Sequence, residues 1–565
     1  MGDRDLSTET IFIGVAWPYA NGPLHLGHLA GANLPPDIFA RFHRACGNKV
    51  LMVSGSDCHG TPVTLRAEAE NMSPADLAER YQQSFQESWR QLGITWDLFT
   101  TTMTPNHYAT TQDLFLRLLE RGYIYRDSMQ AFFCPTCNRF LPDRYVEGTC
   151  PHCGGRARGD QCPDCGKVLD ATDLIEPKCK ISNDTPRLAD TEHFFLDLSQ
   201  FEGRIREWIS GKDHWKPNVK AFTNNWLEAG LRGRPITRDI EWGVPVPVEG
   251  FEHKRIYVWF DAVIGYLSAS KEWAQNHGEP EAWREFWEPP AKPYYFIGKD
   301  NITFHTIIWP SMLMGYGDLL LPYDVPANEF LTLEGRPLST SKNWAIWVPD
   351  FLSRYEADPL RYMLSANMPE AADTDFSWSE FVRRNNNELV AAYGNLVHRV
   401  MTFTHRSFGG KVPETGTLAE PDHAVLAQAE RTFEIVTTEI SLCHFRSAIG
   451  EAMALAREGN RYFDQKAPWR QVKEDRAACG TTINTCLQLI ATLRTLFYPF
   501  LPFSSQALHH QLGFEGALGQ GDWAQQTVPA GQQLGEAQPL FKRLDESVVE
   551  EEREQLQKQQ SEPPK

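Results

Sequence analysis

Residues 11–28 read Ile-Phe-Ile-Gly-Val-Ala-Trp-Pro-Tyr-Ala-Asn-Gly-Pro-Leu-His-Leu-Gly-His. The run Ile11–Trp17 is apolar and ends at Pro18, which is typical of a fully buried parallel strand. Pro18–Pro23 is rich in turn-forming residues, and a helical pattern begins at about Leu24. The stretch therefore predicts a buried strand that passes through a turn into a helix.

A second helix and strand extend this pattern into an open sheet. Ile38–Cys46 carries apolar residues on one side of a helix, and Val50–Gly55 is another buried apolar run with polar residues after it. Strand-like sequence resumes at Arg255–Phe260 and Tyr294–Ile297. Strands alternating with helices indicate a doubly wound parallel α/β sheet, which binds ligands at the carboxyl ends of its strands. We expect one such domain, split by an insertion that begins near residue 123.

The insertion is dominated by cysteines. Seven of the 12 cysteines lie between Cys134 and Cys179, and clustered Cys-x2-Cys pairs in a large chain are typical of metal ligands. Four of them fill the tetrahedral coordination of Zn²⁺ and leave no open position, so we predict structural zinc at Cys150, Cys153, Cys162 and Cys165. Three more sulfurs leave a second zinc open, at Cys134, Cys137 and Cys179.

Composition narrows the class of protein. The 565 residues carry 55 Lys and Arg and 73 Asp and Glu, a net charge of −18, which excludes a protein that coats nucleic acid through bulk positive potential. No apolar run reaches the ~18 residues that a membrane span needs, and the first residues lack the apolar core of a leader peptide. We expect a cytoplasmic protein that binds neither membrane nor DNA.

Beyond Asp350 the pattern becomes helical. Phe381–Phe403, Glu430–Asp464 and Asn484–Phe497 have apolar residues at three- and four-residue spacing, which predicts an all-helical C-terminal domain. The acidic, Gln-rich segment 545–565 is predicted to be a disordered tail.

His25-Leu-Gly-His28 lies between the first strand and the helix. A helix N-terminus with exposed N–H groups favours phosphate, and imidazoles can donate hydrogen bonds to charge that develops on it. The whole string 17–28 resembles the His-Ile-Gly-His signature of class I aminoacyl-tRNA synthetases, in the form found in the methionyl-tRNA synthetases. The resemblance implies a Rossmann-like sheet split by a zinc-knuckle insertion and followed by an all-α anticodon-binding bundle.

Gly335-Arg-Pro-Leu-Ser-Thr-Ser-Lys342 stands where that family carries a Lys-Met-Ser-Lys-Ser loop, in a variant similar to archaeal-type enzymes. Pro337 and Thr340 replace the two lysines, so Arg336 and Lys342 are the candidate cations for the ATP phosphates. The resemblance implies catalytic roles for His25, His28, Lys342 and Arg336. It implies ATP contacts from Tyr19, Gly27, Gly298, Lys299, Asp300, Ser339, Thr340 and Ser341.

A thioether is apolar and polarizable, so aromatic walls suit a methionine side chain. By resemblance, Asp57 holds the α-ammonium group, and the pocket is lined by Trp17, Tyr19, Trp259, Ala262, Tyr266, Phe304, His305 and Trp309. Val263 stands where the family often has Pro, and Arg238-Asp239 matches a family position near the substrate. Relatives with two zincs have a cysteine where this chain has Ser182.

The resemblance also assigns anticodon contacts to Asn395, Arg399 and Trp469, because single-stranded RNA is read by stacking and by hydrogen bonds to base edges. The expected partners are tRNA(Met), L-methionine and ATP with Mg²⁺, and the expected state is a monomer. The expected divisions are two catalytic halves at 1–122 and 254–325, the insertion at 123–253, a loop and stem-contact region at 326–384, the helical domain at 385–544 and the tail at 545–565.

Two alternative functions remain possible for this sequence. Synthetases for isoleucine, leucine, valine or cysteine share the nucleotide signature. A zinc-ribbon RNA-binding protein with a decayed synthetase body would explain the altered loop.

Overall fold

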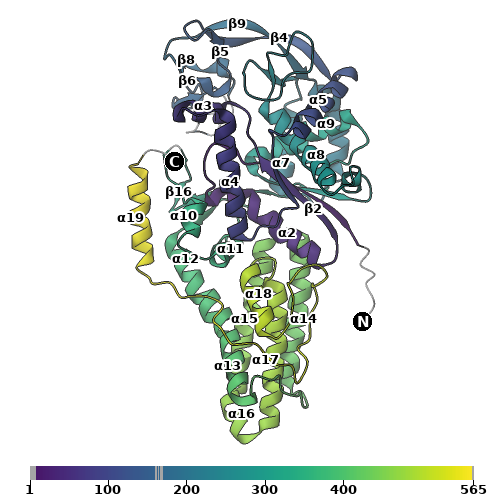
Figure 1. The fold of residues 1–565 in the computed structure, drawn as a ribbon, viewed down its shortest axis with the longest axis vertical. Coiled ribbons are helices and arrows are strands. Elements are labelled where there is room, and N and C mark those ends of the chain that lie inside the picture. Colours follow the sequence, from purple (N-terminus) through teal and green to yellow (C-terminus); the bar gives the residue numbers. More distant parts are fainter. Residues whose placement is uncertain (1–7, 160–161, 163–164, 166–168, 341, 563–565) are drawn as a thin grey trace.

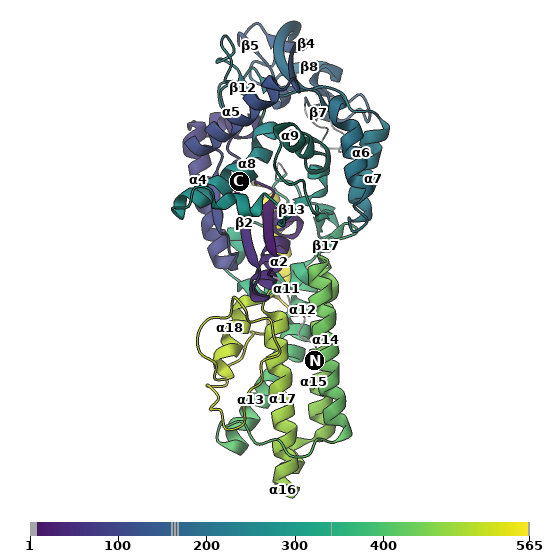
Figure 2. The same cartoon turned by 90° about the vertical axis from the view of Figure 1, so that its right-hand side faces the viewer.

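The computed structural model describes residues 8–159, 162, 165, 169–340 and 342–562. Three tiers follow one another along the long axis of the molecule: the Cys-rich insertion, a parallel sheet with its helices, and a helical bundle (Figure 1). The same order is visible from the side (Figure 2).

The middle tier is a five-stranded parallel sheet in the order β14-β13-β1-β2-β3. Its strands are Ala327–Asn328, Lys292–Gly298, Thr10–Val15, Lys49–Ser56 and Leu98–Thr101. Ile13 of β1 pairs with Tyr294 on one side and Met52 on the other, so the strand order reverses direction at β1. Open parallel sheets bind ligands at such a switch point, and both β1 and β13 lead into expected site motifs there.

Helices cover this sheet. They are α2 (Leu34–Ala45), α3 (Thr61–Glu70), α4 (Pro74–Leu92), α5 (Pro105–Glu120), α8 (Val258–Asn276) and α9 (Trp309–Tyr316). The helix expected after the turn at Pro18–Pro23 is short: α1 spans Leu26–His28 and continues through a π-helical turn at Leu29–Asn33 into α2.

The strand expected at Arg255–Phe260 is wrong beyond Ile256. Strand β12 is only Arg255–Ile256, and α8 begins at Val258. Both faces of the first turns of α8 are buried, including Val258, Phe260 and Ile264. A short apolar run without polar alternation does not distinguish a buried strand from a buried helix.

The insertion is an antiparallel arm. Strands β4 (Ile124–Cys134) and β9 (Arg187–Leu196) pair along their length and form a sheet with β5 (Arg139–Phe140) and β10 (Arg234–Pro235). Between β4 and β9 lies a knuckle module with the sheet β7-β6-β8, made of Arg156–Arg158, Val146–Thr149 and Ile175–Cys179. After β9 come α6 (Glu202–Ser210), α7 (Pro217–Glu228) and β11 (Thr237–Arg238).

The segment after the sheet connects it to the bundle. It holds β15 (Leu331–Leu333), β16 (Arg336–Pro337), α10 (Val348–Leu352), α11 (Ala357–Ala366), β17 (Thr374–Phe376) and α12 (Trp378–Arg384). A π-helical stretch, Asn385–Gly394, joins α12 to the bundle, whose helices are α13 (Asn395–Phe408), α14 (Glu420–Ser441), α15 (Phe445–Lys466), α16 (Pro468–Glu474), α17 (Arg476–Phe497) and α18 (Pro502–Gln511).

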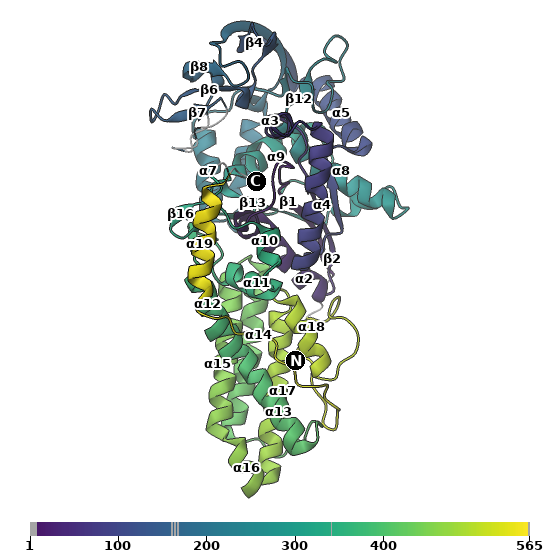
Figure 3. The same cartoon turned by 60° about the vertical axis from the view of Figure 1, so that its left-hand side comes forward.

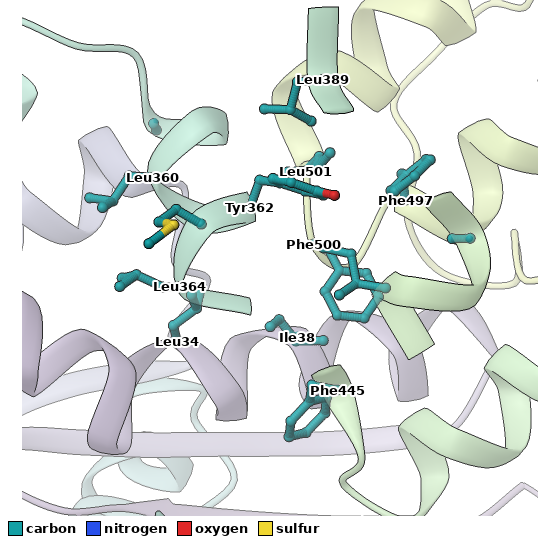
Figure 4. Packing of buried hydrophobic residues seen from close by; sticks show 14 of the residues in the cluster. Leu34, Ile38, Leu360, Tyr362, Leu364, Leu389, Phe445, Phe497, Phe500 and Leu501 are labelled. Atoms are coloured by element: carbon teal, nitrogen blue, oxygen red, sulfur yellow. The ribbon is translucent and has the colours of Figure 1, made fainter. Parts of the chain in front are cut away.

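The bundle packs directly on the catalytic tier. Leu34 and Ile38 of α2 lie in one buried cluster with side chains of α11, α15 and α17 (Figure 4). In the same junction, Asp37 accepts hydrogen bonds from Arg41 at 3.0 Å and Arg361 at 2.7 Å. Despite burial, these cations lower the pKa of Asp37 to about 2. Arg361 also donates to the carbonyls of Phe500 at 2.7 Å and Pro499 at 2.9 Å, so this buried charge pair joins α2 to the chain that follows α17.

The disordered tail expected at 545–565 is wrong for most of its length. Residues Val548–Gln560 form the helix α19, which lies away from the bundle beside α12 and β16 (Figure 3). Leu556 and Glu552 are buried, and Glu552 accepts hydrogen bonds from Arg354 and Tyr355 of the segment that connects the sheet to the bundle. The segment is too polar to be recognised as helical by its own apolar pattern, and its contacts with distant residues hold it.

Within the described ranges, none of the helices combines the length and the apolarity required to cross a bilayer.

Candidate active site

A cavity of about 530 Å³ opens at the carboxyl ends of β1 and β13. Its walls come from both catalytic halves and from the loop after β15. Among the expected residues it is lined by Trp17, Tyr19, His25, Gly27, His28, Asp57, Trp259, Ala262, Tyr266, Gly298, Asp300, Phe304 and His305.

The two histidines stack with ring centroids 3.9 Å apart. The backbone N–H of Gly27 donates to Nδ1 of His25 at 3.1 Å, and the N–H of His25 donates to Nδ1 of His28 at 3.1 Å. Since each Nδ1 accepts a hydrogen bond, each ring carries its proton on Nε2, the donor that it can offer to a ligand. Burial lowers both pKa values, that of His28 to about 4, and the neighbouring ring lowers that of His25 further. The pair therefore acts as two neutral donors.

The loop at Gly335–Lys342, called the signature loop from here on, lies against His25–His28, the histidine motif. A Cβ atom on Gly27 would lie 2.8 Å from Cδ1 of Leu338, so the absence of a side chain at Gly27 allows the contact. Pro337 and Leu338 line the cavity beside the histidines. Further along, the N–H of Leu26 donates to the carbonyl of Ile346 at 3.2 Å. The two motifs therefore share one cleft.

The loop begins in a hairpin. Glu334 and Gly335 have positive φ values and form the tight turn between β15 and β16. The guanidinium of Arg336 lies 3.9 Å from the ring centroid of Trp344. Ser339 and Trp344 exchange two backbone hydrogen bonds at 2.9 Å, which close the loop.

The tip of the loop is at the surface. Thr340 and Lys342 are exposed, and the N–H of Lys342 donates to Oγ of Ser339 at 3.3 Å. These side chains, like that of Arg336, stand beside the cavity rather than in its lining. The expected contact Ser341 lies outside the described residues.

The apolar end of the cavity is lined by aromatic side chains. Trp259 and Phe304 stack with centroids 4.4 Å apart, and Tyr19 meets Trp259 edge-on at 6.0 Å. Trp17 lies against Gly55 and Gly265, where a Cβ atom would come within 2.4 Å and 2.7 Å of the indole. These two glycines are therefore required for the position of Trp17.

The side chains of His305 and Tyr266 are hydrogen-bonded to each other. Nδ1–H of His305 donates to the carbonyl of Asn301 at 2.9 Å, so its Nε2 accepts from the hydroxyl of Tyr266 at 2.8 Å. Burial lowers the pKa of His305 to about 4. Trp309, expected in the same wall, is fully buried behind Tyr266 with ring centroids 6.4 Å apart and does not line the cavity.

Asp57 is a buried carboxyl group at the junction of the polar and apolar ends. Burial, followed by the nearby Asp261, raises its pKa well above the ordinary value. Behind it, Nδ1 of His59 is 2.7 Å from Oδ2 of Asp261, and the N–H of His59 donates to Oδ1 of Asp57 at 3.3 Å. A cationic ligand group beside Asp57 would lower this pKa and stabilise the charged carboxylate. His59 and Asp261 were not expected from the sequence, although His59 follows the same strand as Asp57.

Lys299 is held at the rim. Its ammonium donates to Glu329 at 2.8 Å and to Asp373 at 2.7 Å, and both carboxylates line the cavity. Asp300 lies inside, next to Gly298, where a Cβ atom would be 3.0 Å from Oδ1 of Asp300. Glu329 directly follows the carboxyl end of β14, and this position in the sequence could have indicated it as a site residue. No local pattern indicated Asp373.

Arg238 and Asp239 are outside the cavity lining. The guanidinium of Arg238 lies 3.8 Å from the ring centroid of Tyr257, and Asp239 accepts from Lys254 at 2.6 Å and from Thr191 at 2.8 Å. These contacts join the base of the insertion to the start of α8.

The cysteines gather as expected. The sulfurs of Cys150, Cys153, Cys162 and Cys165 lie within 4.8 Å of one another, with Cys150–Cys165 at 3.9 Å and Cys153–Cys162 at 3.6 Å. A tetrahedron of ~2.3 Å Zn–S bonds has S–S edges of about 3.8 Å, so the set fits zinc.

A second set of cysteines is close by. The sulfurs of Cys134, Cys137 and Cys179 also lie within 4.8 Å of one another, and Oγ of Ser182 is 3.3 Å from Sγ of Cys134. Three thiolates and a hydroxyl therefore stand where four thiolates would close a site.

The three anticodon candidates converge at the distal end of the bundle. Asn395 and Arg399 of α13 face Asn460 and Asp464 of α15, and the guanidinium of Arg399 lies 4.6 Å from the ring centroid of Phe463. Trp469 packs beside Phe463 at 6.1 Å and is 40% exposed. An exposed indole beside polar groups is a suitable platform for a base.

Comparisons with known proteins agree with this geometry. The family model described as "tRNA synthetases class I (M)" matches residues 11–401, and that described as "Anticodon binding domain of methionyl tRNA ligase" matches residues 412–561. The chain belongs to the methionyl-tRNA synthetase family. The family expected from the sequence is thereby confirmed.

Relatives in this family match over nearly the whole length. The methionine–tRNA ligase of Thermomicrobium roseum is 52% identical, covering 97% of this chain and 99% of its own. That of Dehalococcoides mccartyi strain CBDB1 is 56% identical, covering 96% and 99%. The chain is thus a methionine–tRNA ligase, and neither another class I synthetase nor a non-catalytic scaffold is favoured.

Among solved structures, the Mycobacterium tuberculosis methionyl-tRNA synthetase bound by methionyl-adenylate is similar with a TM-score of 0.80. The sequence identity is 24%, and the match covers 94% of this chain and all of that one. It supports the fold: a parallel-sheet core, a Cys-rich insertion and a helical domain.

Proposed function

We propose that the cavity at the switch point is where this methionine–tRNA ligase joins methionine to AMP. The observation that carries the proposal is the meeting of the histidine motif and the signature loop across one cavity. Its apolar end suits a thioether, and its polar end suits a nucleotide. The methionine carboxylate attacks the α-phosphorus of ATP, pyrophosphate leaves, and the adenylate then esterifies the terminal ribose of tRNA(Met).

His25 and His28 serve the first step as donors. Charge builds on the phosphate oxygens during the displacement, and preorganised donors in a buried site stabilise that charge more than water does. The backbone N–H groups that donate to both Nδ1 atoms fix the orientation of the rings before substrate binds. Neither ring needs to gain or lose a proton, since no side-chain nucleophile is required.

Three cations assist the leaving pyrophosphate. Arg336 and Lys342 stand on the exposed loop, and Lys299 stands at the rim between two carboxylates. ATP arrives as its Mg²⁺ complex and competes with Glu329 and Asp373 for the Lys299 ammonium. The remaining loop and rim positions, Gly298, Asp300, Ser339, Thr340 and Ser341, bind the nucleotide.

The amino acid is selected by shape and by one charge. The rings around Trp259 and Phe304 enclose the thioether, and Asp57 pairs with the α-ammonium group. Because Tyr266 donates to His305, the apolar end offers no hydroxyl proton from Tyr266 to a polar side chain. A hydrophilic analogue of methionine would therefore lose its hydrogen bonds with water on entry.

The metal sites are structural. Cys150, Cys153, Cys162 and Cys165 would hold one zinc, which stabilises a module whose own apolar core is small. Cys134, Cys137 and Cys179 would hold a second zinc more weakly, because Ser182 supplies a hydroxyl in place of a thiolate.

The module orients the acceptor end of the tRNA, while Asn395, Arg399 and Trp469 contact the anticodon at the far end of the molecule. The enzyme acts as a cytoplasmic monomer.

Pyrophosphate exchange with each amino acid in turn tests the proposal. We expect ATP-dependent exchange with methionine alone, and loss of methionine affinity in Asp57→Asn with little change in the KM for ATP. Exchange with isoleucine, valine or cysteine, or none with any amino acid, would overturn it.

A further inference from the structure

Helix α19 returns from the bundle to the catalytic tier and is fixed there at several points (Figures 1 and 3). Glu552 accepts hydrogen bonds from the hydroxyl of Tyr355 at 2.6 Å and from Arg354. Arg553 pairs with Glu334, the first residue of the hairpin turn that opens the signature loop, at 3.1 Å. The helix therefore touches the beginning of the loop through its middle.

The last turn of α19 grips the end of the same loop. Nε2 of Gln559 donates to the carbonyls of Asn343 at 3.0 Å and Ala345 at 2.8 Å. In return, Nδ2 of Asn343 donates to the carbonyl of Gln559 at 2.6 Å. Asn343 follows Lys342 directly, is buried and has a φ of 49°, a left-handed conformation that needs local support. One side chain on α19 thus binds the backbone on both sides of Trp344.

The segment that Gln559 grips is also bonded to the histidine motif. Ile346 accepts from the N–H of Leu26 at 3.2 Å, and the N–H of Val348 donates to the carbonyl of Leu24 at 2.8 Å. Residues 343–348 therefore lie between α19 on one side and the strand-like stretch around His25 on the other. The segment therefore connects the loop to the stretch that carries His25.

We propose that Gln559 is a positioning residue for adenylate formation, which holds the base of the signature loop so that Arg336 and Lys342 reach the leaving pyrophosphate. This inference rests on the role proposed above for the loop. Without the amide of Gln559, the carbonyls of Asn343 and Ala345 each lose one donor. The left-handed turn at Asn343 keeps its bond to the backbone carbonyl of residue 559 but loses the support of the Gln559 side chain. The loop then spends less time in the productive arrangement, while the methionine end of the cavity is untouched.

The test compares three full-length variants with the wild type in methionine-dependent pyrophosphate exchange. Gln559→Ala removes the amide. Gln559→Glu keeps its size but offers no proton to the two carbonyls. Gln557→Ala is the matched control, since it changes an exposed glutamine on the same turn of α19.

We expect Gln559→Ala and Gln559→Glu to lower kcat about tenfold, equivalent to ~1.4 kcal/mol, and to raise the KM for ATP while the KM for methionine stays constant. Gln557→Ala should match the wild type. Should Gln559→Ala not fold, Gln559→Glu carries the test at nearly equal volume.

Two results would overturn the inference. One is wild-type kcat and ATP KM in both Gln559 variants. The other is a parallel worsening of the methionine KM and the melting temperature, which would indicate a general structural role. A wild type without methionine-dependent exchange would instead refute the proposed function, so the two failures are distinguishable.

Discussion

Placing an alanine at Gly27 tests whether the histidine motif and the signature loop meet. Gly27 is helical, so alanine is compatible with its backbone and, judged by helix propensity alone, would stabilise α1. The added Cβ atom would lie 2.8 Å from Cδ1 of Leu338 and 2.9 Å from Cε1 of His25, whereas ordinary contacts begin at 3.4 Å. The variant must therefore displace the loop, the imidazole or both.

Overpacking of this kind costs about 1–3 kcal/mol, so the kcat/KM of pyrophosphate exchange should fall by roughly 5- to 150-fold. Leu338→Ala removes one of the two obstructing groups. In that background the Gly27→Ala change should cost ~1 kcal/mol less, a partial recovery of about fivefold.

The assay is a double-mutant cycle on four proteins: wild type, Gly27→Ala, Leu338→Ala and the double variant. Independent sites give additive effects within ~0.5 kcal/mol. Additivity here would mean that Leu338 does not contact Gly27 and that the shared cleft is incorrectly described. An unchanged circular dichroism spectrum is the control for folding, and a modest fall in melting temperature is the expected sign of the overpacking.

Four further results are expected. His28→Ala should slow adenylate formation by ~10²–10³-fold with methionine affinity retained, because one donor to the developing charge is lost; an unchanged exchange rate would exclude the role. Cys162→Ser should lower the zinc content by one ion per chain in metal analysis, and full zinc retention would contradict the four-thiolate site. Trp469→Ala should weaken aminoacylation by ~1–3 kcal/mol yet leave pyrophosphate exchange intact; equal losses in both assays would make Trp469 structural. Burial lowers the pKa values of His28, His43 and His305 from 6.5 to about 4, 3 and 4, so unfolding takes up protons below pH 6.5. The free energy of unfolding should therefore fall as the pH drops from 6.5 towards 4, by ~1.4 kcal/mol per pH unit for each group, and a pH-independent melting temperature would refute neutral burial.

Local patterns were sufficient for the centre of the fold. The apolar run before Pro18 and the run at Val50–Gly55 are strands β1 and β2, because strands buried on both faces are apolar throughout. Asp57 follows β2 directly and the histidines follow β1 after the turn at Pro18–Pro23, so their convergence at the carboxyl edge could be inferred from chain order.

Contacts between distant segments were beyond such patterns. Asp373 holds Lys299 across 74 residues, and neither neighbourhood indicates the pair. Helix α19 carries few apolar residues and is held by Glu552, Arg553 and Gln559, whose partners precede them by about 200 residues. Apolar periodicity detects a helix that buries an apolar face. A helix that is held mainly by polar side chains lacks this periodicity and is not predicted from it.

The antiparallel arm has an implication for how this architecture changes over time. Strands β4 and β9 pair from Ile124 with Leu196 to Phe133 with Arg187, so the chain enters and leaves the knuckle module at adjacent points. A module attached through such a stem can lengthen, shrink or exchange a ligand without altering the register of the parallel sheet. Apart from the stem, a principal attachment is Tyr145, whose hydroxyl bonds with Thr64 at 3.0 Å and Glu68 at 3.1 Å. A hydroxyl at Ser182 where a fourth thiolate would close the second cysteine site therefore leaves the parallel sheet and the cavity at its edge unaltered.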